Sequence, residues 1–268
     1  MPATRRIGDE ADSKLSYSVE VIAHIQYRRG LPATEGCYSA WRALEDRGWE
    51  IRPFEHIDEV AIDSEQPVIG GVPNVVAALD QLGVVPPDVD YPAALRPFLL
   101  DPALETTTMG WARHARDRWP MFVKPTTGRK EFTGFVLQRT DDLLRVTSVD
   151  DELPVFVGRP VDLRTKVEWR AFVIDGEVRD IRPYTGRADG DAPSLTFVQM
   201  LANQWHSIPA GCSNDVVNIG DRAGPDWRVV ECNDGYSLGS FGLFPSSYAE
   251  LLVKRWAELV GIGELWYA

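Results

Sequence analysis

Residues 166–186, KVEWRAFVIDGEVRDIRPYTG, contain two alternating apolar runs that an Asp-Gly dipeptide at 175–176 joins. Asp-Gly between alternating runs is a strong turn signal, so the segment predicts an antiparallel β-hairpin. Side chains alternate along a strand, and Glu168 and Arg170 therefore share a face of the first arm, while Arg182 lies on the returning arm. We expect the hairpin to present several charged side chains to one cleft.

The segment before the hairpin follows a strand–helix alternation that is typical of a small parallel sheet. Glycine ends both predicted helices, as expected at a helix C-terminus. The elements expected here are a strand at 19–25, a helix at 37–48 closed by Gly48, strands at 49–54 and 67–71, and a helix at 73–83. We expect residues 1–18 to be disordered because they are polar, and residues 19–105 to form an N-terminal α/β domain.

The pattern changes in the remaining residues, 106–268, where helices and antiparallel strands predict an α+β region. The expected helices are 109–119, 193–205 and 245–261, the last capped by Ser246 or Ser247, with a short helix inside 91–100. The expected strands are 121–125, 135–139 and 153–158, followed by the hairpin and a final pair at 215–221 and 226–234. The fold class is therefore mixed α/β and α+β.

Composition and charge exclude several classes of protein. The formal net charge of −12 argues against a broad nucleic-acid or anionic-membrane surface, which needs cationic side chains. No apolar run is as long as a membrane span, and the N-terminus has no signal-peptide pattern. The three cysteines and four histidines form neither a CxxC nor an HExxH pattern, so a disulfide framework and a zinc site are not expected. We expect a cytoplasmic protein.

The stretch RVVECNDGYSLG, residues 228–239, places a carboxylate and a carboxamide near the end of an apolar strand. The period of two puts Glu231 and Asn233 on one face, with Cys232 on the opposite face toward the core. Two neighbouring oxygen donors suit Mg²⁺. The alternative is an ordinary polar strand end that runs into a turn at Asp234.

Cationic residues and glycines recur in the segments that would surround this strand end. Lys124 ends an apolar strand, Lys130 lies in a loop between Gly128 and Gly134, and the hairpin arginines follow. Lysines and arginines bind phosphate, and glycines let backbone N–H groups approach it closely. Each residue alone has an ordinary structural explanation, but together they predict a polyphosphate site.

The order of these motifs resembles the ATP-grasp superfamily over roughly residues 60–260. It is most similar to a bacterial and phage branch named for two arginines and a lysine. The motifs are FVKP, KEFTG, PVFVG, EWRAFVIDGEV, RPYTG and DV…VVECNDGYSLGSFGL, in that order. The resemblance implies an ATP-grasp fold that holds a nucleotide between two α+β lobes, after a small N-terminal pre-ATP-grasp domain.

The resemblance also implies a role for individual residues. ATP is expected to contact the side chains of Lys124 and Lys130, the glycines Gly128 and Gly134, the main chain of Val155, Phe156 and Val157, and Glu168. Mg²⁺ is expected at Glu231 and Asn233, with Asp215 as a third ligand and Asp226 as its rival, since the stretch from 215 to 231 is longer than a compact hairpin. Arg170 and Arg182 are expected to act in catalysis. One would face the γ-phosphate and the other the substrate carboxylate, and either arginine suits either role.

The reaction implied is ATP-dependent ligation of a carboxylate to an amine through an acylphosphate. Phosphoryl transfer requires positioning and charge neutralisation more than a covalent nucleophile, so the absence of a Ser-His-Asp pattern is no obstacle. The expected substrates are a small-molecule or peptide carboxylate and an amine, whose identities the sequence leaves open, as it does the oligomeric state. The alternatives are a phosphotransferase that uses the same ATP cleft and a non-catalytic nucleotide-binding module.

Overall fold

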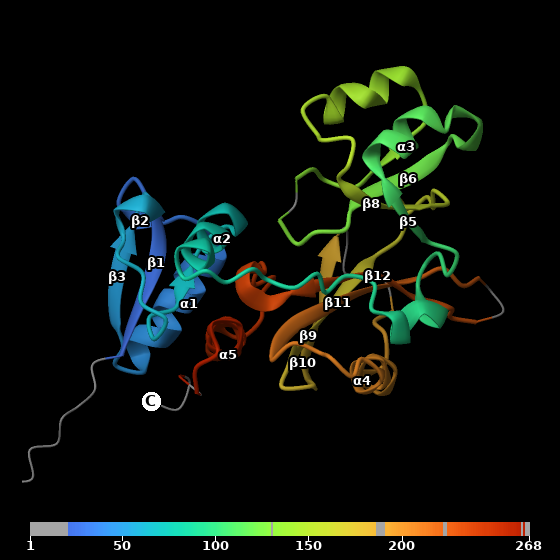
Figure 1. Ribbon diagram of the computed structural model, residues 1–268. Coiled ribbons are helices and arrows are strands. Elements are labelled where there is room, and N and C mark those ends of the chain that lie inside the picture. The colour runs from blue at the N-terminus through green and yellow to red at the C-terminus, as the bar shows by residue number, and fades with distance from the viewer. Residues whose placement is uncertain (1–20, 130, 186–190, 222–223, 264, 266–268) are drawn as a thin grey trace, which may run out of the picture.

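The computed structural model describes residues 21–129, 131–185, 191–221, 224–263 and 265 of the chain. The described residues form three four-stranded sheets, with the N-terminal sheet at the left of Figure 1 and the other two stacked at its right. The strands are β1 (Ile22–Arg28), β2 (Leu31–Pro32), β3 (Glu50–Phe54), β4 (Val68–Ile69), β5 (Glu105–Thr108), β6 (Met121–Pro125), β7 (Phe135–Leu137), β8 (Pro154–Gly158), β9 (Glu168–Ile174), β10 (Glu177–Thr185), β11 (Gly211–Asn218) and β12 (Trp227–Asp234). The α-helices are α1 (Glu35–Asp46), α2 (Val72–Gln81), α3 (Met109–His114), α4 (Leu195–Gln204) and α5 (Pro245–Val260).

The N-terminal sheet confirms the predicted parallel arrangement. β1 pairs in parallel with both β3 and β4, and the short β2 adds an antiparallel edge. The side chain of Thr34 caps α1 by accepting from the N–H of Cys37 at 3.1 Å. Gly48 closes that helix with a left-handed φ of 82°, which a residue without a Cβ adopts at little cost.

The middle sheet has the strand order β5-β8-β6-β7. β5 was not predicted, because its sequence ETTT shows no apolar alternation. The predicted helix 109–119 is shorter than expected: α3 ends at His114, and a single 3₁₀ turn (Arg116–Arg118) follows. A connector, defined here as residues 84–104, joins α2 to this sheet and includes a 3₁₀ segment (Ala93–Phe98).

The C-terminal sheet has the order β10-β9-β11-β12, with every pair antiparallel. The predicted hairpin is confirmed as β9 and β10, and its turn residues Asp175 and Gly176 have φ values of 51° and 77°. Positive φ at both central positions matches the twist of the strands, which is why Asp-Gly suits this turn. β11 starts at Gly211, before the predicted boundary at Asp215.

Helix α5 connects the C-terminal sheet to the N-terminal unit and lies between them in Figure 1. One core cluster contains α1 residues, Phe172 of β9 and much of α5. The predicted serine cap of α5 is wrong, because the helix begins at Pro245 with Phe244 at the N-cap and no side-chain cap. Proline at the first helical position needs no N–H partner there, so the helix starts earlier than a serine cap would require.

The predicted domain division at residue 105 stays a proposal. Leu95 and Leu99 of the connector pack into the core of the C-terminal sheet, and Leu99 forms a bridge with Val229. Residues 1–18, predicted to be disordered, lie outside the described residues. Within the described residues, no helix has both the length and the apolarity that crossing a bilayer requires.

The burial of Trp256 predicts that α5 holds the molecule together. Its side chain is 1% exposed, packs with residues of α2 and with Tyr236, and donates from Nε1 to the carbonyl oxygen of Ser64 at 2.8 Å. We expect Trp256→Ala to lower the free energy of unfolding by about 3–5 kcal/mol, because it leaves a large cavity. Urea denaturation measures the loss, and Leu144→Ala, at a side chain 75% exposed, is the control expected to change stability little. Equal effects of the two substitutions would contradict this role of α5.

Candidate active site

A row of four charged residues crosses one face of the C-terminal sheet. Arg182 of β10 pairs with Arg170 of β9, Arg170 pairs with Asp215 of β11, and Asp215 pairs with Glu231 of β12. Residues directly opposite in antiparallel strands place their side chains on the same face. The sheet therefore gathers residues that lie far apart in the sequence into one line.

Arg170 and Asp215 form a buried, two-pronged ion pair at the centre of this row. The Arg170 Nε donates to Oδ1 of Asp215 at 2.8 Å, and its Nη2 donates to Oδ2 at 2.6 Å. Arg170 is 4% exposed and Asp215 is fully buried. Burial raises the pKa of Asp215 to about 7, against the opposing effect of the Arg170 hydrogen bonds.

The two arginines that the sequence singled out differ in their surroundings. The Arg170 guanidinium lies 4.2 Å from the centroid of the Tyr184 ring and 5.0 Å from that of Phe241. Arg182 lies on the same face but pairs with Asp180 at 2.6 Å and remains 41% exposed. Arg170 is thus held in a buried site, whereas Arg182 is more accessible and its partner Asp180 is partly exposed.

Glu231 and Asn233 line a cavity, together with their neighbours in β12. The Asn233 Nδ2 donates to Oδ2 of Asp215 and to Oε1 of Glu231, both at 3.1 Å. Asp215 does not line this cavity, and its oxygens accept hydrogen bonds from Arg170 and Asn233. These contacts place Asp215 beside Arg170 and Asn233, and its expected role as a third metal ligand stays a prediction.

Asp226, the rival of Asp215, lies at the other end of β12 and forms an ion pair with Arg228 at 2.8 Å. Asp215 is instead the direct cross-strand partner of Glu231. A register shift after Asp215 and the longer loop beyond Asn218 account for the spacing that the sequence left ambiguous.

Lys124 extends from the middle sheet to the C-terminal sheet. Its Nζ lies 2.5 Å from Oε2 of Glu231 and 2.5 Å from Oδ2 of Asp90, a connector residue. Burial by itself lowers the pKa of the ammonium group, but the charges of Asp90 and Glu231 outweigh this effect and hold that pKa well above its usual value. Lys124 is therefore a fixed cation between the two sheets.

The cavity has a volume of about 600 Å³ and lies between the middle and C-terminal sheets, with the connector along one side. This volume is within the usual range for a small-molecule site. Of the residues predicted to bind a cofactor, Lys124, Gly128, Gly134 and Glu168 line it. A Cβ at Gly134 would lie 3.1 Å from the Phe122 ring and 3.3 Å from the Lys124 Cβ, so glycine permits this close packing. Lys130 lies outside the described residues.

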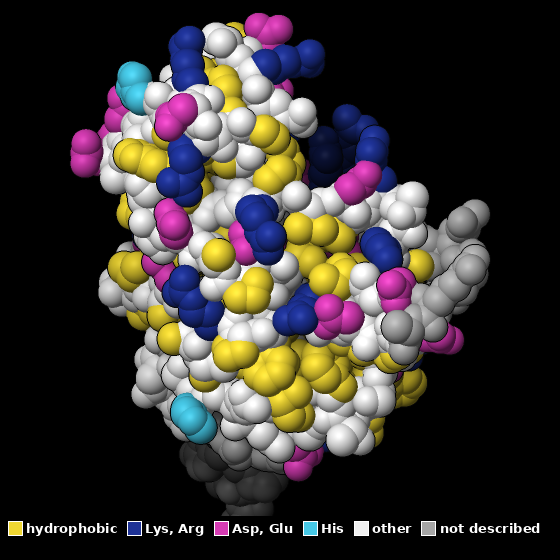
Figure 2. Space-filling view, turned by 90° about the vertical axis from the view of Figure 1, so that its right-hand side faces the viewer, with side chains coloured by type: hydrophobic (Ala, Val, Ile, Leu, Met, Phe, Trp, Pro, Cys, Tyr) yellow, Lys and Arg dark blue, Asp and Glu magenta, His cyan; other side chains and the backbone are white. Residues whose placement is uncertain are grey.

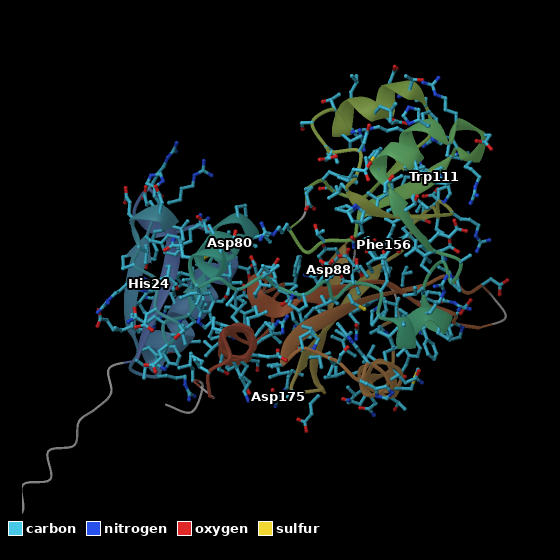
Figure 3. All side chains as sticks on the ribbon, viewed as in Figure 1. His24, Asp80, Asp88, Trp111, Phe156 and Asp175 are labelled. Carbon is cyan, nitrogen blue, oxygen red and sulfur yellow. The ribbon has the colours of Figure 1, made fainter. Side chains whose placement is uncertain are left out.

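The loop around Gly128 contacts three other parts of the molecule. The N–H of Gly128 donates to Asp88 of the connector at 3.2 Å, and its carbonyl oxygen accepts from the Tyr236 hydroxyl at 2.9 Å. The neighbouring Arg129 pairs with Asp80 of α2 at 2.8 Å. Figure 3 labels Asp80 at α2 and Asp88 between α2 and the two stacked sheets.

The expected contact of ATP with the main chain at 155–157 does not agree with the sheet. β8 is an internal strand, because β5 pairs with one of its edges and β6 with the other, throughout residues Val155, Phe156 and Val157. Its backbone N–H and C=O groups are therefore used in the ladders and are not available to a base. The cavity is lined instead by Arg159, Val161 and Leu163 of the loop that follows β8.

Sequence reasoning missed the contribution of the connector. Asp90, Tyr91 and Asp101 all line the cavity, and Asp101 accepts from the N–H of Arg159 at 2.7 Å. The signal available was the acidic pair in DVDY at 88–91, which stands between prolines in a region with no regular pattern. The expectation for Cys232 is confirmed, because it is buried in the core of the C-terminal sheet together with Trp205.

Among the residues that the structure describes, no group of three or more His, Cys, Asp or Glu side chains is arranged to hold a metal ion. Glu231 and Asn233 nevertheless offer neighbouring oxygen donors to the cavity. This donor set fits Mg²⁺, which usually binds to one or two carboxylates together with substrate phosphates rather than to an all-protein cage.

The ion pair of Arg170 and Asp215 generates a stability prediction. Asp215→Leu would leave the Arg170 charge buried without its carboxylate, so we expect a loss of about 3–5 kcal/mol in the free energy of unfolding. The double variant Arg170→Met with Asp215→Leu should recover most of that loss, because an apolar pair needs no partner charge. Urea denaturation compares both with Asp162→Leu, whose exposed partner is Arg164 and whose removal should matter little. A double variant no more stable than Asp215→Leu would contradict the prediction.

Basic and acidic side chains are interspersed on the face of the molecule in Figure 2, and Lys or Arg do not gather there into one surface.

Comparison with known proteins agrees with this architecture. The chain is similar to the crystal structure of a RimK domain ATP-grasp protein from Sphaerobacter thermophilus DSM 20745, with a TM-score of 0.53, 14% identity, and coverage of 87% of this chain and 98% of that one. Lower similarity is found to the ATP-grasp ligase PsnB complexed with a minimal precursor (TM-score 0.45, 14% identity, coverage 90% and 99%). The D-alanine–D-alanine ligase from Bacillus anthracis gives a TM-score of 0.45 at 13% identity, with coverage of 89% and 96%. No curated protein matches the sequence.

The likeness to the Sphaerobacter protein confirms the expected fold. Residues 102–251, more than half of the chain, match the family described as ATP-grasp domain, R-2-K clade family 2. This match includes the middle sheet from β5 onward and the whole C-terminal sheet with its row of charges. The chain therefore belongs to the ATP-grasp proteins, in family 2 of the R-2-K clade.

Proposed function

We propose that this protein is an ATP-dependent carboxylate–amine ligase that forms an amide through an acylphosphate. The observation that carries the proposal is the position of Lys124 beside Glu231 at the boundary of a cavity between two sheets. A cation, a carboxylate and a carboxamide at this place suit a polyphosphate with Mg²⁺. Family membership in the ATP-grasp proteins supports the same interpretation.

The lining of the cavity suggests how ATP would be bound. Phe122, Val136, Val161 and Leu163 provide an apolar surface for the base, while Lys124 and the Gly128 loop lie at the polar side. We propose that the base lies against the loop that follows β8, since the backbone of β8 itself is fully paired. The phosphates would then extend toward Lys124, whose ammonium supplies a point charge.

Glu231 and Asn233 are the residues proposed to hold Mg²⁺, with Asp215 fixing the amide of Asn233 from behind. The ion would neutralise charge on the phosphate oxygens. To bind it, Glu231 would exchange its contact with the Lys124 ammonium for the metal, and Lys124 would turn that side of its ammonium to phosphate. In this proposal, Glu231 and Lys124 would each change partners without leaving the site.

The two arginines have different roles in this proposal. Arg182 would stabilise the phosphoryl group in transfer, since its partner Asp180 is partly exposed and is easily exchanged. Arg170 would orient the substrate carboxylate through Nη1, because its Nε and Nη2 are bonded to Asp215. The carboxylate oxygen would attack the γ-phosphorus with ADP leaving, and the amine would then displace phosphate to give the amide. The opposite assignment of the two arginines is the alternative.

The partners in this proposal are a small-molecule or peptide carboxylate and an amine, in a cytoplasmic protein. An ADP-release assay across amino acids and short peptides, with product mass spectrometry, tests it. A ligase yields ADP, phosphate and an amide only when acid and amine are both present. A stable phosphorylated product would instead indicate a phosphotransferase, and ATP binding with no product under any pairing would indicate a non-catalytic module.

Glu231→Gln provides the sharpest test of the metal role. The substitution keeps the size of the side chain but removes the charge, so we expect turnover with Mg²⁺ to fall about 100-fold or more. ADP release at saturating ATP measures the effect, with Glu152→Gln on an exposed loop as the control for the loss of one carboxylate. Full activity of Glu231→Gln would refute the proposed metal site.

A further inference from the structure

Lys124 has an unusual set of neighbours for a residue proposed to bind phosphate. Its Nζ contacts two carboxylates at 2.5 Å, one from β12 and one from the connector. In the proposed reaction Glu231 leaves Lys124 for the metal. A largely buried lysine that lost all of its protein partners would have no fixed position, so the second carboxylate, that of Asp90, decides where the ammonium lies.

Asp90 is itself held on both of its oxygens. Oδ2 contacts the Lys124 ammonium, and Oδ1 accepts the backbone N–H of Cys232 at 2.9 Å. The Asp90 side chain is only 12% exposed. Cys232 lies between Glu231 and Asn233, so Asp90 ties the connector to the strand that carries the proposed metal ligands. Asp90 therefore sets the position of Lys124 relative to that strand directly.

Tyr91 encloses the same ammonium from another side. The Lys124 Nζ lies 5.2 Å from the centroid of the Tyr91 ring, which suits a cation–π contact. The ring meets Phe156 of β8 edge-on with centroids 4.8 Å apart. Tyr91 also adopts a left-handed φ of 51°, an uncommon conformation for a bulky residue, which persists where the surrounding structure imposes it. The connector is thus built to turn Asp90 and Tyr91 toward Lys124.

The alternative is that Asp90 occupies the place of a phosphate and must leave when ATP binds. The burial of Asp90 and its bond to the β12 backbone argue against this, since its departure would leave a buried N–H without a partner. Asp88 differs from Asp90, because its side chain is exposed and accepts a hydrogen bond from the Gly128 N–H. Asp90 has the properties of a fixed part of the site.

We propose that Asp90 is a positioning residue that, together with the Tyr91 ring, holds the Lys124 ammonium at the point where it meets the phosphates of the nucleotide. This role rests on the proposed function. In this role the connector contributes directly to phosphate recognition. The connector joins the N-terminal unit to the middle sheet.

The test is calorimetric titration of the full-length protein with ATP and Mg²⁺, and separately with adenosine. We expect Asp90→Asn to weaken ATP binding by about 10-fold, because asparagine keeps the acceptor for Cys232 but loses the charge that fixes the ammonium. Adenosine binding should stay within about twofold, since the base does not contact this group. Asp63→Asn, whose exposed carboxylate likewise accepts a backbone N–H, at 2.9 Å, is the matched control and should leave both affinities unchanged.

A double-mutant cycle separates positioning from a general structural effect. In a Lys124→Met background, Asp90→Asn should weaken ATP binding by less than about twofold, because the group that it positions is gone. An equal loss for adenosine, an undiminished effect in the Lys124→Met background, or tighter ATP binding by Asp90→Asn would each overturn the inference. If Asp90→Asn does not fold, Tyr91→Leu replaces it in the same titrations, with an expected loss of about threefold for ATP and none for adenosine.

The outcomes for the proposed function are distinct. A wild-type protein that binds no ATP, or whose ATP affinity survives Lys124→Met, overturns the nucleotide site itself. A wild-type protein that binds ATP through Lys124, while Asp90→Asn binds it equally well, overturns only the role of Asp90.

Discussion

The contact of Lys124 with Glu231 and Asp90 is the interaction on which the site depends. It joins a strand of the middle sheet, a strand of the C-terminal sheet and the connector at one ammonium group. A cation shared by two carboxylates in a largely buried place is stable only if all three groups are held, because each would be costly to bury alone. The cavity between the sheets therefore has a fixed charged boundary before any ligand enters.

Behind this boundary the C-terminal sheet provides a second layer of fixed charges. The antiparallel order β10-β9-β11-β12 brings Arg182, Arg170, Asp215 and Glu231 into one row. Arg170 and Asp215 are buried and neutralise each other, while the two residues at the ends of the row remain partly exposed. The centre of the row is thus a buried ion pair, and its two ends are the more accessible charges.

The N-terminal unit takes part in this arrangement through packing and through the connector. Helix α5 shares one core with α1 and another with α2, so the unit is fixed against the C-terminal sheet. The chain that leaves α2 then crosses to the cavity and supplies Asp88, Asp90 and Tyr91. Among the residues described, the N-terminal sheet contributes no strand to the cavity lining, which receives Val72 of α2 and several residues of the connector.

Local residue patterns were enough to predict the elements that have strong signals. Asp175-Gly176 fixed the hairpin, glycines marked the helix ends, and alternation placed Glu231 and Asn233 on one face, because these signals act over a few residues. The pairings between distant strands became evident in the folded molecule alone. The register of β9 and β11 places Arg170 opposite Asp215, and β5 and β6 pair with the two edges of β8. The connector brings Asp90 to Lys124 from a distant part of the chain. Such contacts depend on strand order and chain path, which residue patterns within a short window do not specify.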